Sequence, residues 1–527
     1  MIRRLLVLAC VILCGGGASA ASSATFRFAF QGGLNSLDPY SLNETFTLGV
    51  LGNVVEGLVK RDKDLKIVPA LAERWEVVEP TRWRFHLRKG VKFHDGSPFT
   101  ADDVVFSAER ARAPGSHVKN RIPADAKVVK VDDHTVDFIL TQPNPTLHFE
   151  WESWHILSRR WAEANGALNA QPATATALNA FALKVNGTGA FVVTSHEPGV
   201  KTTFRPNPDW WGKPEHNLSE VVFQTIAGDA TRVAALLSGE VDMIDPLPLQ
   251  DIDRVKAGAK TTALIKPELR TIFLNMDSMR DELLYSSVKG RNPFKDARVR
   301  RAFYQAIDIE AIRAKVMRGL ASPTAIMISP LLFARAGEIK RWPYDVAAAR
   351  RLMSEAGYAD GFELGMDCPN DRYVNDEKIC QAVAAMLARI GVKVTLNALP
   401  KAKFFEKVGP TRKYDTSFNL LGWTPSSLDS WGVLNNVVRC RDKDGKGGTF
   451  NFGGYCNPEI DRLIDRILVE QDVKVRDDMI ARVYQTLRED AGILPLHQQS
   501  LVWGVARNVD IVQREDSQIR FEWIRKR

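Results

Sequence analysis

Three residues at equal spacing, Trp423, Ser426 and Asp429, stand in a loop whose chemistry suits the binding of a small molecule. The loop begins at Gly422 and follows Phe418 to Leu421, an apolar run of the length expected for a buried strand. A strand that ends in a glycine, an aromatic residue and polar residues can present side chains at the mouth of a cleft. The indole of Trp423 offers a flat face for stacking or for a cation. The alternative is a core tryptophan followed by an ordinary surface loop, with Asp429 as the N-cap of the next helix.

Motifs for catalysis and for metal binding are absent or incomplete. The sequence has no GxSxG nucleophile elbow, no HExxH motif and no glycine-rich Walker loop. Two S-x-x-K matches begin at Ser116 and Ser286, without the companion motifs of an acyl-serine hydrolase. A stretch from Asp442 begins like a calcium loop, but Gly453 stands where the bidentate glutamate belongs. We therefore expect a binding protein without cofactor or metal, and not an enzyme.

Six cysteines occur in the chain, and two of them lie in the N-terminal apolar segment. The other four, Cys368, Cys380, Cys440 and Cys456, indicate two disulfides in an oxidising compartment, with three possible connectivities. We prefer the local pairs Cys368–Cys380 and Cys440–Cys456, because each pair brackets turn-rich sequence. A zinc site is the alternative, but no histidine stands at ligand spacing beside these cysteines.

The N-terminus has the features of a secretion signal. Arg3 and Arg4 provide a positive start, and Leu5 to Cys14 is an unbroken apolar run that is too short to span a bilayer. Ala18-Ser-Ala20 fits a small-x-small cleavage site. We expect cleavage after Ala20 and a soluble exported protein.

The composition is that of a globular protein of two to four domains, with 527 residues of which 45% are hydrophobic and 25% are charged. The net charge of +8 comes from 71 basic and 63 acidic residues that are interspersed along the chain. No basic block is present, so we expect no nucleic-acid partner.

Hydrophobic periodicity predicts an α/β fold. Two strand–helix–strand units are predicted, and their spacing is typical of right-handed parallel crossovers. The first unit comprises residues 219–226, 229–238 and 241–244, and the second comprises residues 362–368, 376–390 and 392–396. Because the units are far apart in the sequence, we expect two separate sheets and hence two lobes with a crevice between them.

Three further elements are predicted near the N-terminus. Thr25 to Gln31 has an aromatic residue at every second position, which is typical of a strand. An amphipathic helix is predicted from Thr45 to Val59. Thr100 is a suitable N-cap for a helix over residues 101–112.

An ordered series of motifs extends over nearly the whole chain after the signal. It begins with Pro69-Ala-Leu-Ala-Glu-Arg-Trp75 and with the segment from Phe85 to Ser107. Further motifs are Gly187 to Phe191, Asn207 to Pro214, Leu236 to Asp242, Phe294 to Asp308, Ala349 to Tyr358 and Ile493 to His497. The series resembles the family 5 extracellular solute-binding proteins, the periplasmic dipeptide- and oligopeptide-binding proteins of ABC transporters. This resemblance implies binding without chemistry.

The resemblance also implies a two-lobed periplasmic-binding-protein fold of type II, cluster C, with an extra β-rich subdomain. We assign residues 1–20 to the signal peptide, 21–53, 187–269 and 495–527 to lobe I, 54–186 to the β-rich subdomain, and 270–494 to lobe II. The strands from Leu501 onward are expected to return to lobe I.

In the peptide-binding members that this chain resembles, an aspartate three residues after the cleft tryptophan pairs with the amino group of the peptide. That tryptophan corresponds to Trp423, and the position of the aspartate is occupied by Ser426. A buried ammonium needs a charged partner, so the serine argues against a free α-amine as the anchored group. Asp429 is the substitute that the loop offers.

Two more residues are candidates for ligand contacts. Arg372 suits a substrate carboxylate, because arginine pairs with carboxylates in bidentate geometry; a solvated surface arginine is the alternative. Asn35 follows the first strand, at the edge of the crevice in the family that the chain resembles. Its amide suits a hydrogen bond to a ligand backbone, and a role in the turn is the alternative.

The sequence therefore predicts a periplasmic substrate-binding protein that captures a solute by closure of its lobes and delivers it to the permease of an ABC importer. A peptide or peptide-like compound is the leading ligand class, and opines, oligosaccharides, metal chelates and tetrapyrroles are the alternatives. A stand-alone sensor or chaperone and an exported enzyme are the competing functions. We expect a monomer.

Overall fold

One large mixed sheet organises the chain, of which this computed structural model describes residues 24–442 and 447–527. The sheet contains 11 strands, and their order in space differs from their order in the sequence. From edge to edge the order is β15 (Val392–Leu399), β14 (Phe362–Pro369), β16 (Phe418–Trp423), β12 (Thr261–Met276), β17 (Leu494–Ala506), β11 (Met243–Asp245), β1 (Ala24–Phe30), β10 (Leu218–Thr225), β9 (Lys201–Pro206) and β8 (Phe191–Glu197); β13 (Ala321–Pro323) pairs with β17 off this path.

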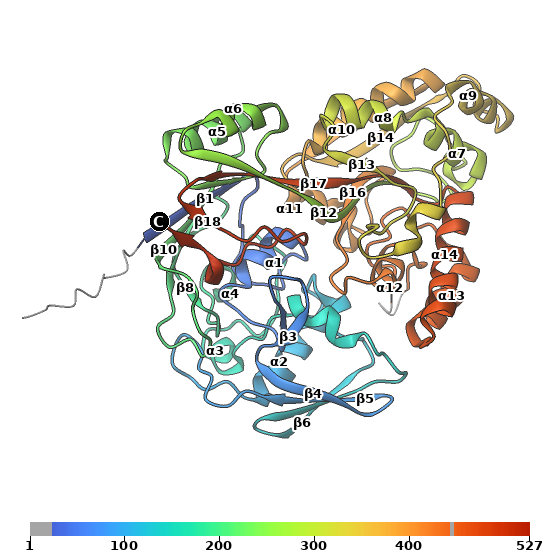
Figure 1. Cartoon of the computed structure of the whole chain (residues 1–527). Coiled ribbons are helices and arrows are strands. Elements are labelled where there is room, and N and C mark those ends of the chain that lie inside the picture. The colour runs from blue at the N-terminus through green and yellow to red at the C-terminus, as the bar shows by residue number, and fades with distance from the viewer. Residues whose placement is uncertain (1–23, 443–446) are drawn as a thin grey trace, which may run out of the picture.

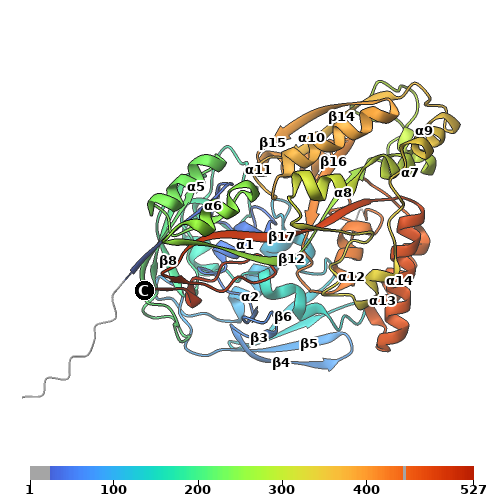
Figure 2. The same cartoon turned by 45° about the horizontal axis from the view of Figure 1, so that its top comes forward.

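Two long strands, β12 with 16 residues and β17 with 13 residues, connect the halves of this sheet. They pair with each other, β12 also pairs with β16, and the C-terminal part of β17 pairs with β11. Both strands cross from one half of the molecule to the other in the two views of Figures 1 and 2. The expectation of two separate sheets was therefore wrong, because strand pairing continues through the strands that link the lobes.

The predicted lobe boundaries at 269/270 and 494/495 both fall inside these connecting strands, β12 and β17. Val505 of β17 pairs with Met243 of β11, which agrees with the predicted return of the C-terminal segment to the first lobe. The domain boundaries stay predictions.

Both predicted crossover units are present. Helix α10 (Asp376–Leu387) connects β14 and β15, which pair in parallel along their whole length. Helix α5 (Asp229–Ser238) connects β10 and β11, and each of these strands pairs in parallel with β1 between them. The predicted helix over 376–390 ends in a 3-10 turn, after which Gly391 adopts φ +80° as a C-terminal cap. The period of the apolar residues is what allowed these units to be predicted.

A second, smaller sheet lies within residues 54–186, where the β-rich subdomain was expected. Its order is β4 (Ala72–Glu79), β5 (Arg82–Leu87), β7 (Thr135–Ile139) and β6 (Lys127–Asp132), with antiparallel pairing throughout. It lies at the bottom of Figure 1, near helix α2 (Ala101–Arg112). The predicted cap of α2 is confirmed, because Thr100 and Asp103 form a reciprocal capping box. A separate pair, β2 (Val59–Arg61) and β3 (Ile67–Pro69), completes this region.

Helix α1 (Thr45–Leu51) is shorter than the predicted helix over residues 45–59. It ends at Gly52, where the Cβ of any other residue would lie 2.5 Å from a terminal nitrogen of Arg520. The N-cap is Glu44, whose carboxylate accepts hydrogen bonds from the backbone of Phe46 and Thr47. The apolar residues after Gly52 remain buried, but in irregular backbone.

The remaining elements cover the large sheet and the lower part of the molecule. They are α3 (Arg159–Ala164), α4 (Ala180–Leu183), α6 (Ile252–Ala257), α7 (Ala297–Ala306), α8 (Ile309–Ala311), α9 (Val346–Glu355), α11 (Lys401–Val408), α12 (Ser430–Val433), α13 (Pro458–Val469), α14 (Val473–Glu489), β18 (Val509–Asp510) and β19 (Arg525–Lys526). Helices α5 and α6 lie over one half of the sheet, and α7, α9 and α10 lie over the other (Figure 1). Among the described residues, none of the helices combines the length and the apolar sequence that crossing a bilayer requires.

Buried apolar residues form three clusters. The first joins β1 to the small sheet, with Phe28 and Phe85 in the same cluster, so the β-rich region shares its core with the first lobe. The second lies around α7 and α10 and extends to residues of α5 and β11 in the first lobe, and the third lies under α13 and α14. All buried members of the third cluster belong to residues 273–493, so it is a core of the second lobe alone.

Candidate functional site

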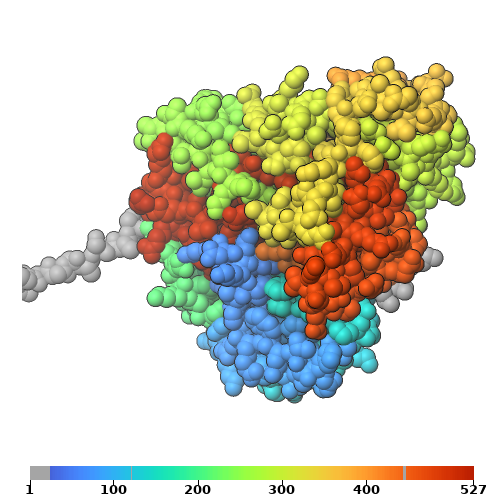
Figure 3. Space-filling model, turned by 45° about the vertical axis from the view of Figure 1, so that its right-hand side comes forward, coloured from blue at the N-terminus to red at the C-terminus, as the bar shows by residue number. Residues whose placement is uncertain are grey.

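A cavity of about 70 Å³ lies between the two lobes and the β-rich region. The first lobe contributes Glu44 and Leu48, and the β-rich region contributes Arg61 and Arg121. The second lobe contributes the end of β16 with the loop that follows it, and the C-terminal return contributes Asp516 and Gln518. In the space-filling view of Figure 3, the blue and cyan surface of the N-terminal third touches the orange-red surface of the second lobe. The lobes are thus in contact around a concave space that both of them line, which is the arrangement expected of a ligand site.

Trp423 ends β16 and lines this cavity, as the sequence predicts. The indole is half-buried beside Phe450, with 4.8 Å between the ring centroids. Its Nε1 has no hydrogen-bond partner among the described residues. Gly422, which precedes it, must be small, because a Cβ there would lie 2.7 Å from the ring of Tyr373. The indole is therefore fixed at the wall of the cavity with its polar atom unused.

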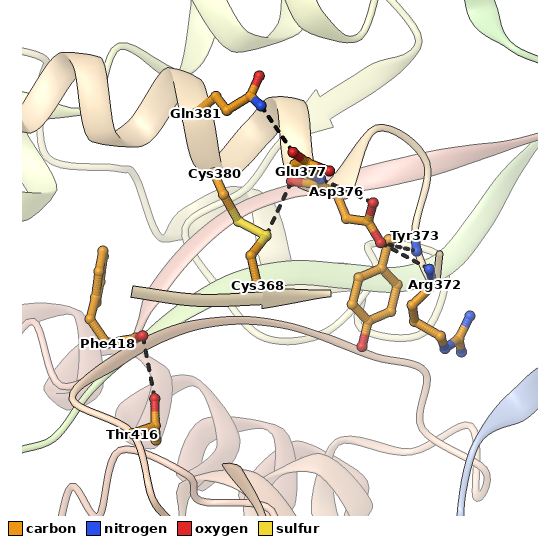
Figure 4. Close-up of a disulfide and its surroundings, with 9 residues drawn as sticks. All are labelled: Cys368, Arg372, Tyr373, Asp376, Glu377, Cys380, Gln381, Thr416 and Phe418. Carbon is orange, nitrogen blue, oxygen red and sulfur yellow. Dashed lines mark hydrogen bonds between the residues drawn. A yellow bond between two sulfur atoms is a disulfide. The ribbon is translucent and has the colours of Figure 1, made fainter. Parts of the chain in front are cut away.

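The loop after β14 presents Arg372 and Tyr373 to the same cavity. Asp376, in the first turn of α10, accepts hydrogen bonds from the backbone nitrogens of both residues at 2.9 Å (Figure 4). The disulfide Cys368–Cys380 ties β14 to α10 beside this loop. Figure 4 shows both side chains extending on the side away from the disulfide. Tyr373 also donates a hydrogen bond to the carbonyl of Gly422, so two loops of the second lobe are held together.

Arg372 is 8% exposed, so the alternative of a solvated surface arginine was wrong. Its Nε lies 2.9 Å from Glu44 Oε1, across the interface between the lobes. The other oxygen of Glu44 pairs with Lys401 Nζ at 3.1 Å, again from the second lobe. Burial by itself raises the pKa of Glu44, but Arg372 and Lys401 outweigh it and hold that pKa well below its usual range. Glu44 was missed in the sequence, where it is the residue before the helix predicted from Thr45 and carries no mark of function.

Arg270 was also missed, although it lines the same cavity as Arg372. It is 2% exposed and lies where the pairing of β12 with β17 shifts register between Pro267 and Thr271. Such an irregularity re-aims side chains, and here it directs a charged residue of a buried strand into the crevice. The Nε of Arg270 donates to Glu268 Oε1 at 2.8 Å. The one signal in the sequence is an isolated arginine directly before the apolar run from Thr271 onward.

Ser426 also lines the cavity, and it contacts the β-rich region. Its hydroxyl donates to Glu150 Oε2 at 2.7 Å and accepts a hydrogen bond from Arg121, and its carbonyl accepts one from Arg61 at 2.6 Å. We name these four residues, Arg61, Arg121, Glu150 and Ser426, the rim contact. The position that suggested an amine site in the sequence is thus engaged in contacts between two parts of the protein.

Asp429 is the N-cap of α12, as the alternative interpretation had it. Its carboxylate accepts a hydrogen bond from Trp431 N at 2.7 Å and pairs with both terminal nitrogens of Arg476 at 2.9 and 2.7 Å. It does not line the cavity. Both oxygens are therefore engaged in the structure of the second lobe.

Asn35 also lies outside the lining of the cavity. It is half-buried beside the turn at Gly199, where an added Cβ would lie 2.7 Å from its Oδ1. Its position agrees with a role in the turn.

The second disulfide, Cys440–Cys456, joins the ends of a loop that follows α12. Both predicted cysteine pairs are therefore confirmed, and their sulfur atoms are not available to zinc. The segment that resembles the start of a calcium loop lies partly in residues 443–446, and the predicted signal peptide with its cleavage site at Ala20 lies in residues 1–23; both are outside the described residues.

Comparison with known families gives one extended match. Residues 66–445 match the model described as bacterial extracellular solute-binding proteins, family 5 Middle. Among curated proteins, the chain is similar to the glutathione-binding protein GsiB of Shigella flexneri, with 24% identity over 487 residues that cover 90% of this chain and 89% of that protein.

Two solved structures have the same fold. One is the periplasmic binding protein DppA of Helicobacter pylori in complex with the peptide STSA, with a TM-score of 0.83, 23% identity, and coverage of 95% of this chain and 98% of that one. The other is AgaA of A.tumefacien R10 in complex with agropinic acid, with a TM-score of 0.82, 24% identity, and coverage of 96% and 99%. These similarities confirm the two-lobed architecture.

Proposed function

Because the chain belongs to the bacterial extracellular solute-binding proteins of family 5, we propose that it captures a peptide or peptide-like solute between its lobes and delivers it to the permease of an ABC importer. The observation that carries this proposal is the cavity between the lobes, which is lined by both of them and contains Trp423 and buried charged groups. Separation of the lobes would widen this cavity and admit a solute.

The two connecting strands offer a physical basis for that movement. Among the strands that the structure describes, only β12 and β17 carry strand pairing from one lobe to the other, and this pairing shifts register between Pro267 and Thr271. A rotation of the lobes can be absorbed by a few residues there, as in hinge closure around a ligand. Closure would then bring Glu44 to Arg372, and Ser426 to the other residues of the rim contact.

The ligand class is inferred from the relatives and from the site together. The similar proteins are described as binding glutathione and a peptide, which supports a peptide-like solute. A second candidate is a non-peptide solute such as an opine. It is favoured by Ser426, which stands where a carboxylate would pair with a peptide amine and is bonded to the rim contact instead.

We infer that the solute is bound and released chemically unchanged. The protein would act in the periplasm as a monomer after removal of the segment up to Ala20. Turnover of a bound compound would instead indicate an enzyme on the same scaffold. Loss of import after deletion of its gene would separate a transport role from that of a stand-alone sensor.

The test is binding and closure in solution. The protein from residue 21 onward is mixed with reduced glutathione, with the dipeptide Met-Leu and with the tetrapeptide STSA, and thermal melting and small-angle scattering are recorded. A ligand should raise the melting temperature and reduce the radius of gyration. Unchanged melting and scattering with these and with a broad panel of opines, oligosaccharides, metal chelates and tetrapyrroles would reject the proposal.

A further inference from the structure

A second cavity, of about 400 Å³, lies between the β-rich region and the second lobe. Leu140 and Leu147 belong to its lining in the β-rich region, and Trp431 of α12 and Leu468 of α13 belong to its lining in the second lobe. Helices α12 and α13 lie beside the β-rich region in both Figure 1 and Figure 2. Small-molecule sites in proteins occupy roughly 300–1,000 Å³, so this cavity is large enough for a ligand.

The rim contact separates this second cavity from the cavity that contains Trp423. Arg121 lines both cavities, Ser426 lines the one with Trp423, and Glu150 lines the second one. The hydroxyl of Ser426 donates to Glu150 Oε2 at 2.7 Å, so this bond joins the wall of one cavity to the wall of the other. A molecule in the second cavity would therefore occupy a site of its own.

The charged residues of the second cavity are engaged within the protein. Arg121 pairs with Glu150 at 3.3 Å, and Arg439 pairs with Asp465. Asp125, the remaining charged residue of the described lining, accepts a hydrogen bond from the hydroxyl of a lining threonine. An ionised ligand group would enter without a free counterion, and removal of an unpaired charge from water is costly. The cavity is therefore suited to an uncharged ligand.

Three polar atoms of the lining are buried and have no hydrogen-bond partner among the described residues. They are Trp431 Nε1, Arg439 Nε and Glu150 Oε1. The first two can only donate, and the carboxylate oxygen accepts. Gln142 and Asn144 add amide groups to the lining, and each amide contains both a donor and an acceptor. Hydroxyl groups suit this mixture, because each of them can both donate and accept a hydrogen bond.

The rest of the lining is apolar. Ile122, Leu140 and Leu147 of the β-rich region are buried, and so is Leu468 of α13. The indole of Trp431 is half-buried and adds a flat aromatic surface. A sugar ring fits such a site, because its C–H face is apolar while its edge carries hydroxyl groups.

We propose that the second cavity binds an uncharged, hydroxyl-rich molecule of the size of a mono- or disaccharide, and that its binding favours the closed form of the protein. The walls of this cavity belong to the β-rich region and the second lobe, which the proposed hinge movement would separate. A molecule that contacts both walls binds the closed form better, so it raises the affinity for the solute, and the solute raises its affinity by the same factor. This coupling rests on the proposed function, whereas the site itself does not.

The site is tested by isothermal titration of the protein from residue 21 onward. The ligands are neutral mono- and disaccharides that include glucose, maltose, sucrose and trehalose. At least one of them should bind one-to-one at concentrations below about 1 mM, far under those at which sugars stabilise proteins by exclusion from the surface. Glucosamine and trehalose 6-phosphate are the charged counterparts of glucose and trehalose. Each should bind roughly tenfold more weakly than its neutral counterpart or worse.

Variants show where the sugar binds. Ala124 is exposed and lines the second cavity, so Ala124→Trp fills that cavity and should weaken sugar binding more than tenfold. Ala164→Trp, at an exposed position of α3 outside both linings, is the matched control and should bind sugar like the wild type. Trp431→Phe keeps an aromatic face but removes the Nε1 donor, and should weaken binding roughly fivefold. Melting without ligand shows which variants are folded, and either folded cavity variant decides the matter.

The coupling is measured with reduced glutathione, Met-Leu and STSA as solutes. A saturating concentration of the sugar should raise the affinity of the solute that binds by roughly fivefold, and that solute should raise the affinity of the sugar by the same factor. Addition of the sugar should leave the solute affinity of Ala124→Trp unchanged. A rise that also occurs in this variant would come from general exclusion of sugar and would contradict the coupling.

The outcomes separate this inference from the proposed function. Failure of every neutral sugar to bind, tighter binding of the charged counterparts, or undiminished binding to folded Ala124→Trp would overturn the second site and leave the proposed function standing. Sugar binding that is lost in Trp423→Ala but kept in Ala124→Trp would identify the sugar as the solute of the other cavity, which also overturns the second site. If sugars bind as expected but no solute binds or compacts the protein, the proposed function fails and the second site stands.

Discussion

Two groups of arginines line the cavity that contains Trp423, and their partners differ. At the rim contact, Arg121 and Arg61 donate to Ser426, and Arg121 pairs with Glu150, so these cations are engaged by other parts of the protein. Arg270 and Arg372 both lie beside the ring of Tyr373, and although both are buried, no described residue accepts a hydrogen bond from their terminal nitrogens. An arginine in a cavity is therefore informative about a ligand only when its partners are known. The rim contact is suited to hold the lobes together, and Arg270 and Arg372 are suited to bind a ligand.

The largest effect is expected at Glu44, whose carboxylate pairs with Arg372 and Lys401. Glu44→Ala leaves Arg372 and Lys401 buried without their carboxylate and removes the N-cap of α1. We expect the free energy of unfolding to fall by about 3–5 kcal/mol, measured by urea denaturation without ligand. Glu459→Ala, which breaks an exposed pair with Arg482, is the control and should unfold almost like the wild type. A loss as small as that of the control would mean that the pair contributes little to the fold.

The next effect concerns Glu152, which lies close to Arg61 of the rim contact. Burial by itself raises its pKa, but Arg520, Arg514 and Arg61 outweigh it and lower the pKa to about 2. The stabilisation is therefore fully present above the unfolded pKa of about 4.5 and is lost as the pH falls from about 4.5 to about 2. Glu152→Gln lacks it, so the difference in unfolding free energy between wild type and variant, up to about 3 kcal/mol at neutral pH, should shrink over that range. A difference that is constant between pH 7 and pH 3 would contradict this pKa.

Trp423 tests whether the solute extends from Arg372, the residue predicted to pair with a solute carboxylate, along the wall of the cavity. Trp423→Ala removes one stacking face, which should weaken ligand binding roughly tenfold, or about 1.4 kcal/mol, in isothermal titration. Any preference for a peptide with a free C-terminal carboxylate over its C-terminal amide should remain, because the guanidiniums of Arg270 and Arg372 are untouched. Equal affinity of variant and wild type would remove this indole from the site.

The smallest effect is expected at Ser426. Ser426→Ala removes two hydrogen bonds of the rim contact but leaves Arg121 paired with Glu150, so closure should lose about 1 kcal/mol. Binding of a peptide with a free C-terminal carboxylate and binding of its C-terminal amide should weaken equally, by roughly fivefold. If only the peptide with the free carboxylate lost affinity, Ser426 would itself contact that carboxylate. The distinction between the rim contact and the group of Arg270 and Arg372 would then be wrong.

The spacing of apolar residues predicted helices and strands correctly where one spacing, that of a helix or that of a strand, runs through the whole segment. The units β10–α5–β11 and β14–α10–β15 follow from apolar spacing and from glycines at helix ends. The helix predicted over residues 45–59 was too long, because Gly52 stands where Arg520 of the distant C-terminal segment approaches the backbone. The single sheet was missed because pairing of β12 with β17 joins residues more than two hundred positions apart.

The site was predicted in part. The residues that were missed depend, like the missed features of the fold, on contacts between distant parts of the sequence. Trp423 and Arg372 line the cavity as expected, since each follows a strand that ends at the crevice. Arg270 belongs to strand β12, and Glu44 is the N-cap of helix α1. The residues that neighbour them in the sequence do not indicate a function for either charge. Their role depends on a register shift and on contacts between lobes, which no local window of sequence contains.

The sequence by itself determined the family motifs, the crossover units and both disulfide pairs, because these depend on residue type and on short spacing. Only the tertiary structure decided which charges are already paired and which face the cavity. The physical reason is that the energy of a buried charge depends on its partners, and in this protein those partners come from three separate parts of the chain.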